Sequence, residues 1–462
     1  MIDDLVSSAL LGTARMPPPA TELVTSPLDP DPAAALLAAA ALEFAFQRGC
    51  AGTAFAAPPT PAPDDERLLL PDAAAHRLGE LLATRSPLLP EWFALAHRYR
   101  APARLVAPLL AFATAQPEHR GDIMTLTGPR GRWLAAQNPD WRDLIPYRAD
   151  DTEPWTHGTP RERRRWLTEV RALDPAAASA ALTATWQQET GADRAALLAI
   201  LEANPLPADE ELLELALDDS RRDVRAAAAH VLIRHPESAY AQRMSRRAQA
   251  WITYRRGELT VAPVLDDSAR RDGLADDAVR LLASATPLDR WPSIFGSPQA
   301  AVAAESPWRA DFLAGWSRAA VAQRNAEWAN LLLAQGRTEV LPAATPNAVT
   351  AYVLTLDSAA LSERPNPFAA LPHPWPAEAV THFLRLALDR AGHAVAELRR
   401  TRANSPAAAQ PALRAAAAHM PVDAVRSLRM IAQQCPDPAW GRALHELGQA
   451  LIIRTTMLEE LM

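Results

Sequence analysis

Between residues 159 and 250 the chain repeats the signals that start and stop helices, and this pattern constrains the fold more than any other feature. Thr159, followed by Pro160 and Glu162, has the form of a capping box with proline at the first helical position. Asp174, also followed by proline, repeats the start signal. We therefore expect about five helices of roughly 10 to 15 residues here, and such helices with short connections form stacked antiparallel pairs.

The last of these helices lies in "LDDSRRDVRAAAAHVLIRHPESAYAQRM", residues 217–244. Its apolar residues follow the i, i+3, i+4, i+7, i+8 spacing of one continuous helical stripe. They are Val224, Ala227, Ala228, Val231 and Leu232. The arginines of the same segment alternate with aspartates, which leaves open a nucleic-acid face, a salt-bridged helix edge or a stacking device.

Composition agrees with a helical, globular chain. The 462 residues are 49% hydrophobic and 22% charged, and 17 Gly stand against a large excess of Ala, the best helix former. All 47 basic residues are Arg, so chemistry that needs a lysine, such as a Schiff base or a Walker-type phosphate site, is excluded. The formal charge of -7 argues against a general nucleic-acid binder.

Two cysteines, Cys50 and Cys435, lie far apart in the chain, which fits a reducing compartment and gives no thiolate metal cluster. The start "MIDDLVSS" places two Asp where a signal peptide needs positive charge. No apolar run reaches the roughly 20 residues of a membrane span. We expect a soluble cytoplasmic protein that binds no membrane and no cofactor.

Proline-rich breaks divide the chain into four expected regions. These are an N-terminal helical region with a Pro-rich linker (1–145), helical repeats (146–256), a mixed helical region with irregular loops (257–376) and a C-terminal helical bundle (377–462). The fold class that follows is all-α.

Three segments of the second half carry local expectations. "GELTVAPVLDD" favours a short extended ribbon, and residues 308–334 are expected to form one long helix. Residues 340–376 are expected to be irregular and locked by prolines, with Trp375 exposed.

One segment resembles a HEAT repeat, because Asp219, Val224 and Arg225 keep the Asp and Val-Arg spacing of that family. The resemblance implies that the Asp caps the turn between two helices and that the Arg bonds to the neighbouring repeat. It also implies an α-solenoid of HEAT-like antiparallel helical pairs. The neighbouring helical pairs lack this spacing.

A wider resemblance rests on four segments in order: "ALLGTAR" (9–15), "GPRGRWLAAQNPDW" (128–141), "TPRERRRWLTEVRALDP" (159–175) and the 217–244 segment. Together they resemble an uncharacterised bacterial family, number 5691 in the series of domains of unknown function. Its members tend to be encoded beside a MoxR-type AAA+ ATPase, a von Willebrand factor A protein and a SWIM zinc-finger protein. The resemblance implies a role in that chaperone-like system and carries over no catalytic residue.

Several arginines are candidates for partner binding. Arg130 and Arg132 belong to "TGPRGRW", which either exposes glycine amides to an anion or turns into a helix anchored by Trp133. Basic residues interleaved with an aromatic can follow a phosphate backbone, whereas the acids mixed among them favour a solvated or inter-repeat face. The second set comprises Arg221, Arg222, Arg246, Arg247, Trp251 and Arg255.

Two motifs suggest enzymes and fail on inspection. His445 and Glu446 lack the second imidazole of a zinc-protease helix. Ser317 sits in "GWSRA", but a nucleophile elbow needs a preceding strand and this stretch is helical in pattern. No catalytic or metal site is predicted.

The predicted function is therefore a non-enzymatic solenoid scaffold or adaptor for protein partners, and the family resemblance suggests the AAA+ ATPase and the von Willebrand factor A protein. The alternative is a nucleic-acid-binding HEAT-like protein related to the alkylpurine DNA glycosylases, for which the arginines around Trp251 would form the contact.

Overall fold

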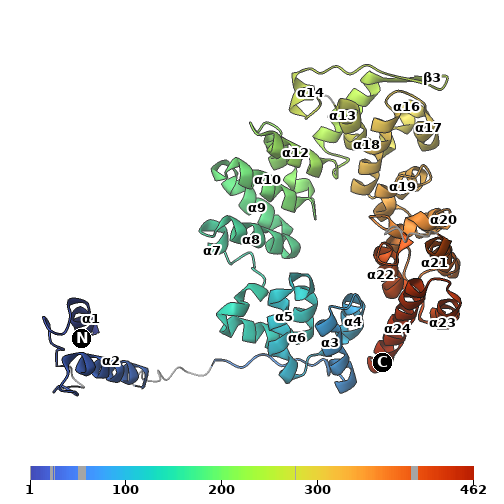
Figure 1. The fold of residues 1–462 in the computed structure, drawn as a ribbon. Coiled ribbons are helices and arrows are strands. Elements are labelled where there is room, and N and C mark those ends of the chain that lie inside the picture. The colour runs from blue at the N-terminus through green and yellow to red at the C-terminus, as the bar shows by residue number, and fades with distance from the viewer. Residues whose placement is uncertain (1, 21–23, 25, 50–58, 276, 397–403) are drawn as a thin grey trace. The chain divides into compact units, whose positions relative to one another are not determined.

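A computed structural model describes residues 2–20, 24, 26–49, 59–275, 277–396 and 404–462. It consists of two compact units, Met1–Ala62 and Pro63–Met462. Helices dominate the described ranges (Figure 1), which confirms the all-α prediction. None of the helices in these ranges combines the length and the apolar character that a membrane crossing requires. The expected boundaries at residues 145, 256 and 376 stay predictions.

The N-terminal unit is a pair of helices, α1 (Ile2–Leu11) and α2 (Pro32–Gly49), that contact each other. Its buried core contains only Leu5, Val24, Leu36 and Ala39 among the described residues. Asp31 starts α2, because its carboxylate accepts bonds from the backbone amides of the next residues.

The larger unit begins with a compact group of short helices around its own core. A two-residue parallel pairing joins β1 (Leu68–Leu69) to β2 (Tyr99–Arg100) within this group. The helices are α3 (Asp72–Thr84), α4 (Leu89–Leu95), η1 (Ala96–Arg98), α5 (Ala103–Ala115), η2 (Pro117–His119), α6 (Arg120–Gln137) and η3 (Pro139–Leu144).

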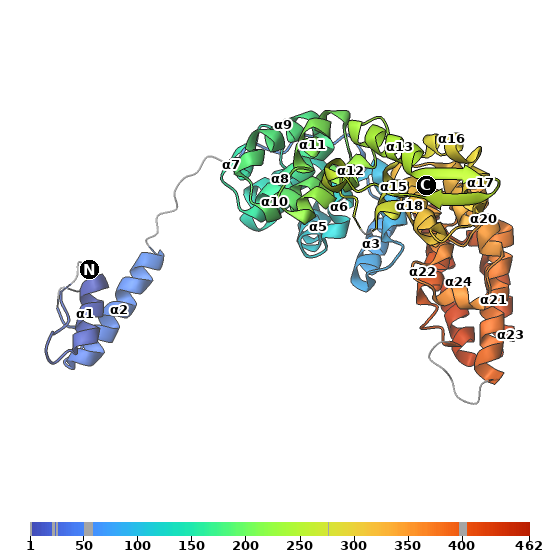
Figure 2. The ribbon, with the colours of Figure 1, turned by 90° about the horizontal axis from the view of Figure 1, so that it is seen from above.

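The expected repeats follow. Within them α8, α10 and α12 contact one another in succession, and each of the pairs α8 with α9 and α11 with α12 is also in contact (Figure 2). The elements are α7 (Glu153–Thr156), α8 (Pro160–Leu173), α9 (Pro175–Thr185), η4 (Trp186–Gln188), α10 (Gly191–Leu201), η5 (Pro207–Asp209), α11 (Glu210–Ala216), α12 (Arg222–Leu232) and α13 (Ala239–Trp251).

The ribbon expected from "GELTVAPVLDD" is present as an antiparallel hairpin. Strand β3 (Ile252–Arg255) pairs with β4 (Glu258–Val261), and Ile252 lies opposite Val261. Arg256 and Gly257 both have positive φ, 54° and 86°. Two such residues form the turn whose twist matches that of a two-stranded ribbon.

The single helix expected over 308–334 is wrong, because the chain breaks it after residue 322. Arg324 adopts a left-handed φ of 51°, and the Asn325 side chain then caps a new helix by accepting from the Trp328 amide at 3.1 Å. The helices of this region are α14 (Asp267–Arg271), α15 (Ala278–Ala285), η6 (Leu288–Arg290), α16 (Pro292–Phe295), α17 (Pro298–Ala303), α18 (Arg309–Ala322) and α19 (Ala326–Leu333).

The segment 340–376 is less irregular than expected, since it contains a full helix. Thr345 caps that helix by accepting from the Ala348 amide. Trp375 was expected to be exposed but is 2% exposed, because it packs against Phe368 and Phe383. The elements are η7 (Thr338–Ala343), α20 (Pro346–Leu354), η8 (Ser358–Ser362) and η9 (Pro367–Ala370).

The C-terminal helices lie side by side (Figure 2), and the last of them completes the first core of the larger unit. Arg454, 3% exposed, donates two bonds to the Glu91 carboxylate at 2.6 and 2.8 Å. Met457 and Leu461 are buried in the core that Leu70–Leu144 otherwise form. The helices are α21 (Ala377–Ala396), α22 (Gln410–His419), η11 (Val422–Ala424), α23 (Val425–Gln434) and α24 (Pro438–Glu460).

Candidate functional site

The repeat region has a regular spacing. The helices α8, α10 and α12 begin at residues 160, 191 and 222, so successive helices start 31 residues apart. Thr159 caps the first helix through a complete capping box with Glu162, as the sequence predicts. Thr190 caps the second by accepting from the Asp193 amide at 3.2 Å. The third has Arg221 at the cap position, without a side-chain cap bond.

An arginine in the first turn of α8 connects this repeat to the next one. The Arg163 Nε donates to the Trp155 carbonyl at 2.9 Å, and its Nη1 donates to Glu189 at 2.7 Å. The guanidinium carbon lies 4.5 Å from the centre of the Trp155 ring. One guanidinium therefore holds a ring and a carbonyl of its own repeat and a carboxylate of the following repeat.

The same arrangement occurs one repeat later. The Arg194 Nε donates to the Trp186 carbonyl at 3.1 Å, and its Nη1 donates to Asp219 at 2.7 Å. The guanidinium carbon lies 5.3 Å from the Trp186 ring centre. Trp155 and Trp186, like the two arginines, are 31 residues apart. The sequence held this signal as a tryptophan followed by an arginine eight residues later, and comparison of the chain with itself at this spacing would have found it.

Asp219 caps its turn and is also the acceptor for the preceding repeat. Its Oδ1 accepts from the Arg221 amide at 2.8 Å, while Oδ2 accepts from Arg194. Burial by itself would raise the pKa of Asp219, but the amide of Arg221 and the guanidinium of Arg194 outweigh it and hold the pKa below its ordinary value. Val224 is fully buried beneath this turn.

Arg225 lies differently from what the HEAT resemblance implies. Its Nη1 donates to the carbonyls of Asp219 and Ser220 at 2.8 and 3.0 Å, both in the turn of its own repeat. The bond between neighbouring repeats is made instead by Arg194 to Asp219. The physical reason is that Arg225 sits one turn into α12, directly above the carbonyls that precede this helix.

A second buried ion pair fixes the opposite end of α8. Arg171 and Asp209 are 2% and 1% exposed, and the Arg171 Nη1 donates to Asp209 Oδ1 at 3.0 Å. Asp209 also accepts from the Ser179 hydroxyl at 2.6 Å and from the Leu206 amide at 2.9 Å. Because every described partner of this carboxylate belongs to the stack, the pair has a structural role.

The arginines around Trp251 do not form the predicted basic and aromatic surface. Trp251 is 5% exposed and belongs to the hydrophobic core, so its ring is not available to stack on a base. Arg247 donates to the fully buried Asp272 at 2.6 Å and to Ser268 at 2.8 Å. Arg246 and Arg255 are exposed.

The glycine and arginine segment near residue 130 is a kinked helix and not an open loop. Gly128 has φ 58° inside α6, and a Cβ placed on it would lie 2.4 Å from side-chain atoms of Asp65 and Arg67. Pro129 follows, so the helix restarts there. The amide positions are buried, while Arg130 and Arg132 point to solvent from the outer face of α6.

Arg221 and Arg222 are exposed at the start of α12. Arg221 donates to both oxygens of Asp223 at 3.0 and 2.7 Å. Its stem covers the start of the preceding repeat, because a Cβ on Gly191 would lie 2.0 Å from the Arg221 Cδ. Of this pair, Arg222 is the residue placed at the surface of the stack without such a contact to the preceding repeat among the described residues.

A cluster that the sequence did not indicate joins α10, α12 and α18. Arg318 lies 2.6 Å from Nδ1 of His230, whose Nε2 lies 3.0 Å from Glu202. Since a guanidinium only donates, Nδ1 accepts and the imidazole is neutral with its proton on Nε2. Arg318 is 88 residues from His230 in the chain, so no local pattern could have predicted this contact.

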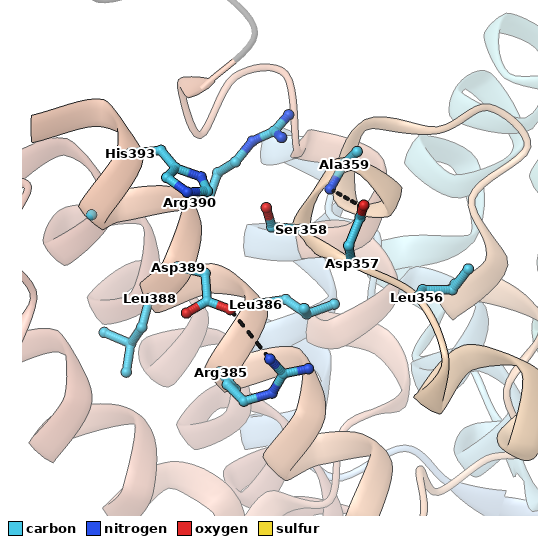
Figure 3. A pocket seen from close by; sticks show the side chains of 11 residues that line it. Leu356, Asp357, Ser358, Ala359, Arg385, Leu386, Leu388, Asp389, Arg390 and His393 are labelled. Carbon is cyan, nitrogen blue, oxygen red and sulfur yellow. Dashed lines mark hydrogen bonds and ion pairs between the residues drawn. The ribbon is translucent and has the colours of Figure 1, made fainter. Parts of the chain in front are cut away.

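A pocket of about 730 Å³ lies between the start of η8 and the second half of α21 (Figure 3). Arg385 pairs with Asp389 at 3.3 Å, and the Asp357 carboxylate caps the Ala359 amide at 2.8 Å (Figure 3). The exposed His393 lines the same pocket. Charges of both signs suit polar side chains of a partner. Within the described ranges, no three His, Cys, Asp or Glu residues are grouped to hold a metal ion.

The fold and these contacts define an all-α protein whose central helices repeat and are linked through arginines. The chain belongs to a family of unknown function, DUF5691, whose model matches residues 4–461. No curated protein and no solved structure matches the chain at a significant level.

Replacement of Arg194 by methionine tests the linkage between repeats. We expect Arg194→Met to destabilise the larger unit by about 2 to 4 kcal/mol, because it leaves the buried Asp219 carboxylate without its counter-charge. Arg222→Met, at an exposed arginine, should change stability by less than about 0.5 kcal/mol. Urea denaturation followed by circular dichroism at pH 7 compares the two, and equal midpoints would show that the bridge carries no stability.

The His230 cluster predicts a loss of stability in mild acid. Burial, with Arg318 next in effect, lowers the pKa of His230. The unfolded chain therefore binds a proton below about pH 6.5 that the folded chain does not bind, and stability falls as the pH decreases through this range. His230→Gln keeps an acceptor and a donor without a charge, so it should lose less stability than wild type between pH 7 and pH 5. Identical pH slopes in urea denaturation would contradict this assignment.

Proposed function

We propose that this protein is a non-enzymatic scaffold or adaptor built on helical repeats. One observation carries the proposal: α8, α10 and α12 recur every 31 residues, and an arginine ties each repeat to the next. A stack of this kind buries one side of each helix against its neighbours and leaves the other as an extended surface. Helical-repeat proteins bind their partners on such surfaces.

The partners we propose are proteins, and the family resemblance points to a MoxR-type AAA+ ATPase and a von Willebrand factor A protein in the cytoplasm. The exposed arginines Arg130, Arg132, Arg221 and Arg222 support a polar contact with such partners. Arginine is favoured at protein interfaces because its planar fork makes several bonds at once. The pocket beside α21 offers a second place for a polar contact.

A binding assay with purified partners tests the adaptor proposal. The full chain, immobilised through a tag, should retain the AAA+ ATPase, the von Willebrand factor A protein or both. Arg221→Glu combined with Arg222→Glu should weaken binding about tenfold or more if the stack edge is the contact. Arg290→Glu, at an exposed arginine outside the repeats, is the matched control. Retention of neither protein would contradict the adaptor proposal.

The alternative is a nucleic-acid-binding protein related to the HEAT-like alkylpurine DNA glycosylases. The observation that favours it is the exposure of Arg246 on α13 and Arg255 on β3. Binding of this kind depends on phosphate contacts and weakens steeply with salt. A duplex DNA whose mobility is unchanged by the protein at low salt would exclude this alternative, whereas binding lost in the Arg246→Glu, Arg255→Glu variant would support it.

A further inference from the structure

The helix α2 of the N-terminal unit is apolar on two sides. One side packs toward α1 and buries Leu36 and Ala39. On the opposite side, Leu37 and Phe44 are 72% and 59% exposed. They are seven residues apart, so they lie on one line along the helix. A helix that is apolar all round is normally covered on every side, and the described residues of this unit leave the second side of α2 open.

The open side of α2 has the spacing of a helix-pairing seam. We call it the outer stripe. Its members follow intervals of three, four and seven residues, as in the seam of paired helices, and all of them are exposed. Small alanines occupy its middle, where they allow close approach of a second helix. The outer stripe consists of Ala33, Leu37, Ala40, Ala41, Phe44 and Arg48.

The charges at the two ends of the outer stripe are opposite. Asp29 and Asp31 lie at the start of α2, and Arg48 lies in its last turn, where its guanidinium carbon is 5.4 Å from the Phe44 ring centre. A second α2 running antiparallel would bring its Arg48 to the acidic end of the first. A parallel partner of the same sequence would place like charges together, which disfavours that arrangement.

The stripe is also self-complementary in its apolar residues. Leu37 and Phe44 are equally distant from a point between Ala40 and Ala41. A two-fold axis through that point would place Leu37 of one copy against Phe44 of the other, twice, with alanines between them. Such a pairing uses the same patch on both copies and closes on itself, as most soluble dimers do.

We propose that the outer stripe of α2 pairs antiparallel with the α2 of a second copy of this chain, about an axis between Ala40 and Ala41. The four-residue core of the N-terminal unit is small for an independent fold, and pairing would convert two such helix pairs into a four-helix arrangement with a shared core. This dimer goes beyond the proposed adaptor function and does not depend on it, since a monomeric chain can still bind partners.

Oligomeric state in solution is the first test. Sedimentation equilibrium of the full chain should show a dimer, and Leu37→Glu should raise its dissociation constant by at least about tenfold, because it removes apolar burial and places a charge in the seam. Leu173→Glu changes a leucine of similar exposure, 65%, on α8 and should leave the dimer intact. A wild-type chain that is monomeric at all concentrations, or a dimer unaffected by Leu37→Glu, overturns the proposal.

Disulfide cross-linking tests the register and does not depend on a charged variant that remains folded. In a chain with Cys50→Ser and Cys435→Ser, a mixture of Leu37→Cys and Phe44→Cys chains should cross-link to each other, and neither should cross-link efficiently to itself. Parallel pairing predicts the reverse. Leu42→Cys, exposed on a different line of α2, is the control. Self-linkage of Leu37→Cys, or equal cross-linking of the control, overturns the antiparallel pairing.

Discussion

The arginine bridge between successive repeats is the interaction on which the central helices depend. Glu189 and Asp219 are carboxylates with 2% and 4% of their side chains exposed, and an unpaired charge at that depth is strongly unfavourable. Arg163 and Arg194 supply the counter-charge and at the same time bind a carbonyl and lie against a tryptophan ring. Only a planar guanidinium with five donors meets all three demands, which fits a chain whose basic residues are all arginine.

The same chemistry separates two classes of arginine in this protein. Arg171, Arg194 and Arg247 each bind a buried carboxylate and hold elements together. Arg222 and Arg246 point to solvent and remain available to a partner. The distinction matters for function, because a run of arginines in the sequence overstates the charge that the surface offers to nucleic acid.

Local patterns predicted much of the fold for identifiable reasons. The capping box at Thr159, the stripe beneath Val224 and the hairpin after Trp251 depend on neighbours within a few residues, so the sequence alone indicates them. The break at Arg324 was missed because a left-handed residue other than glycine leaves little local signal. The cover over Trp375 was missed because Phe383 reaches it from a different helix.

The sequence by itself determined an all-α chain, its helix starts and the family to which it belongs, since these rest on residue type and short spacing. Only the tertiary structure decided which arginines meet carboxylates, because those partners lie about 25 residues or more along the chain, as Arg194 and Asp219 do. It also decided that Arg318 meets His230 and that Arg454 of the last helix meets Glu91 in the first core of the larger unit. Pairings over such distances depend on how helices stack, and a local pattern contains no information about that.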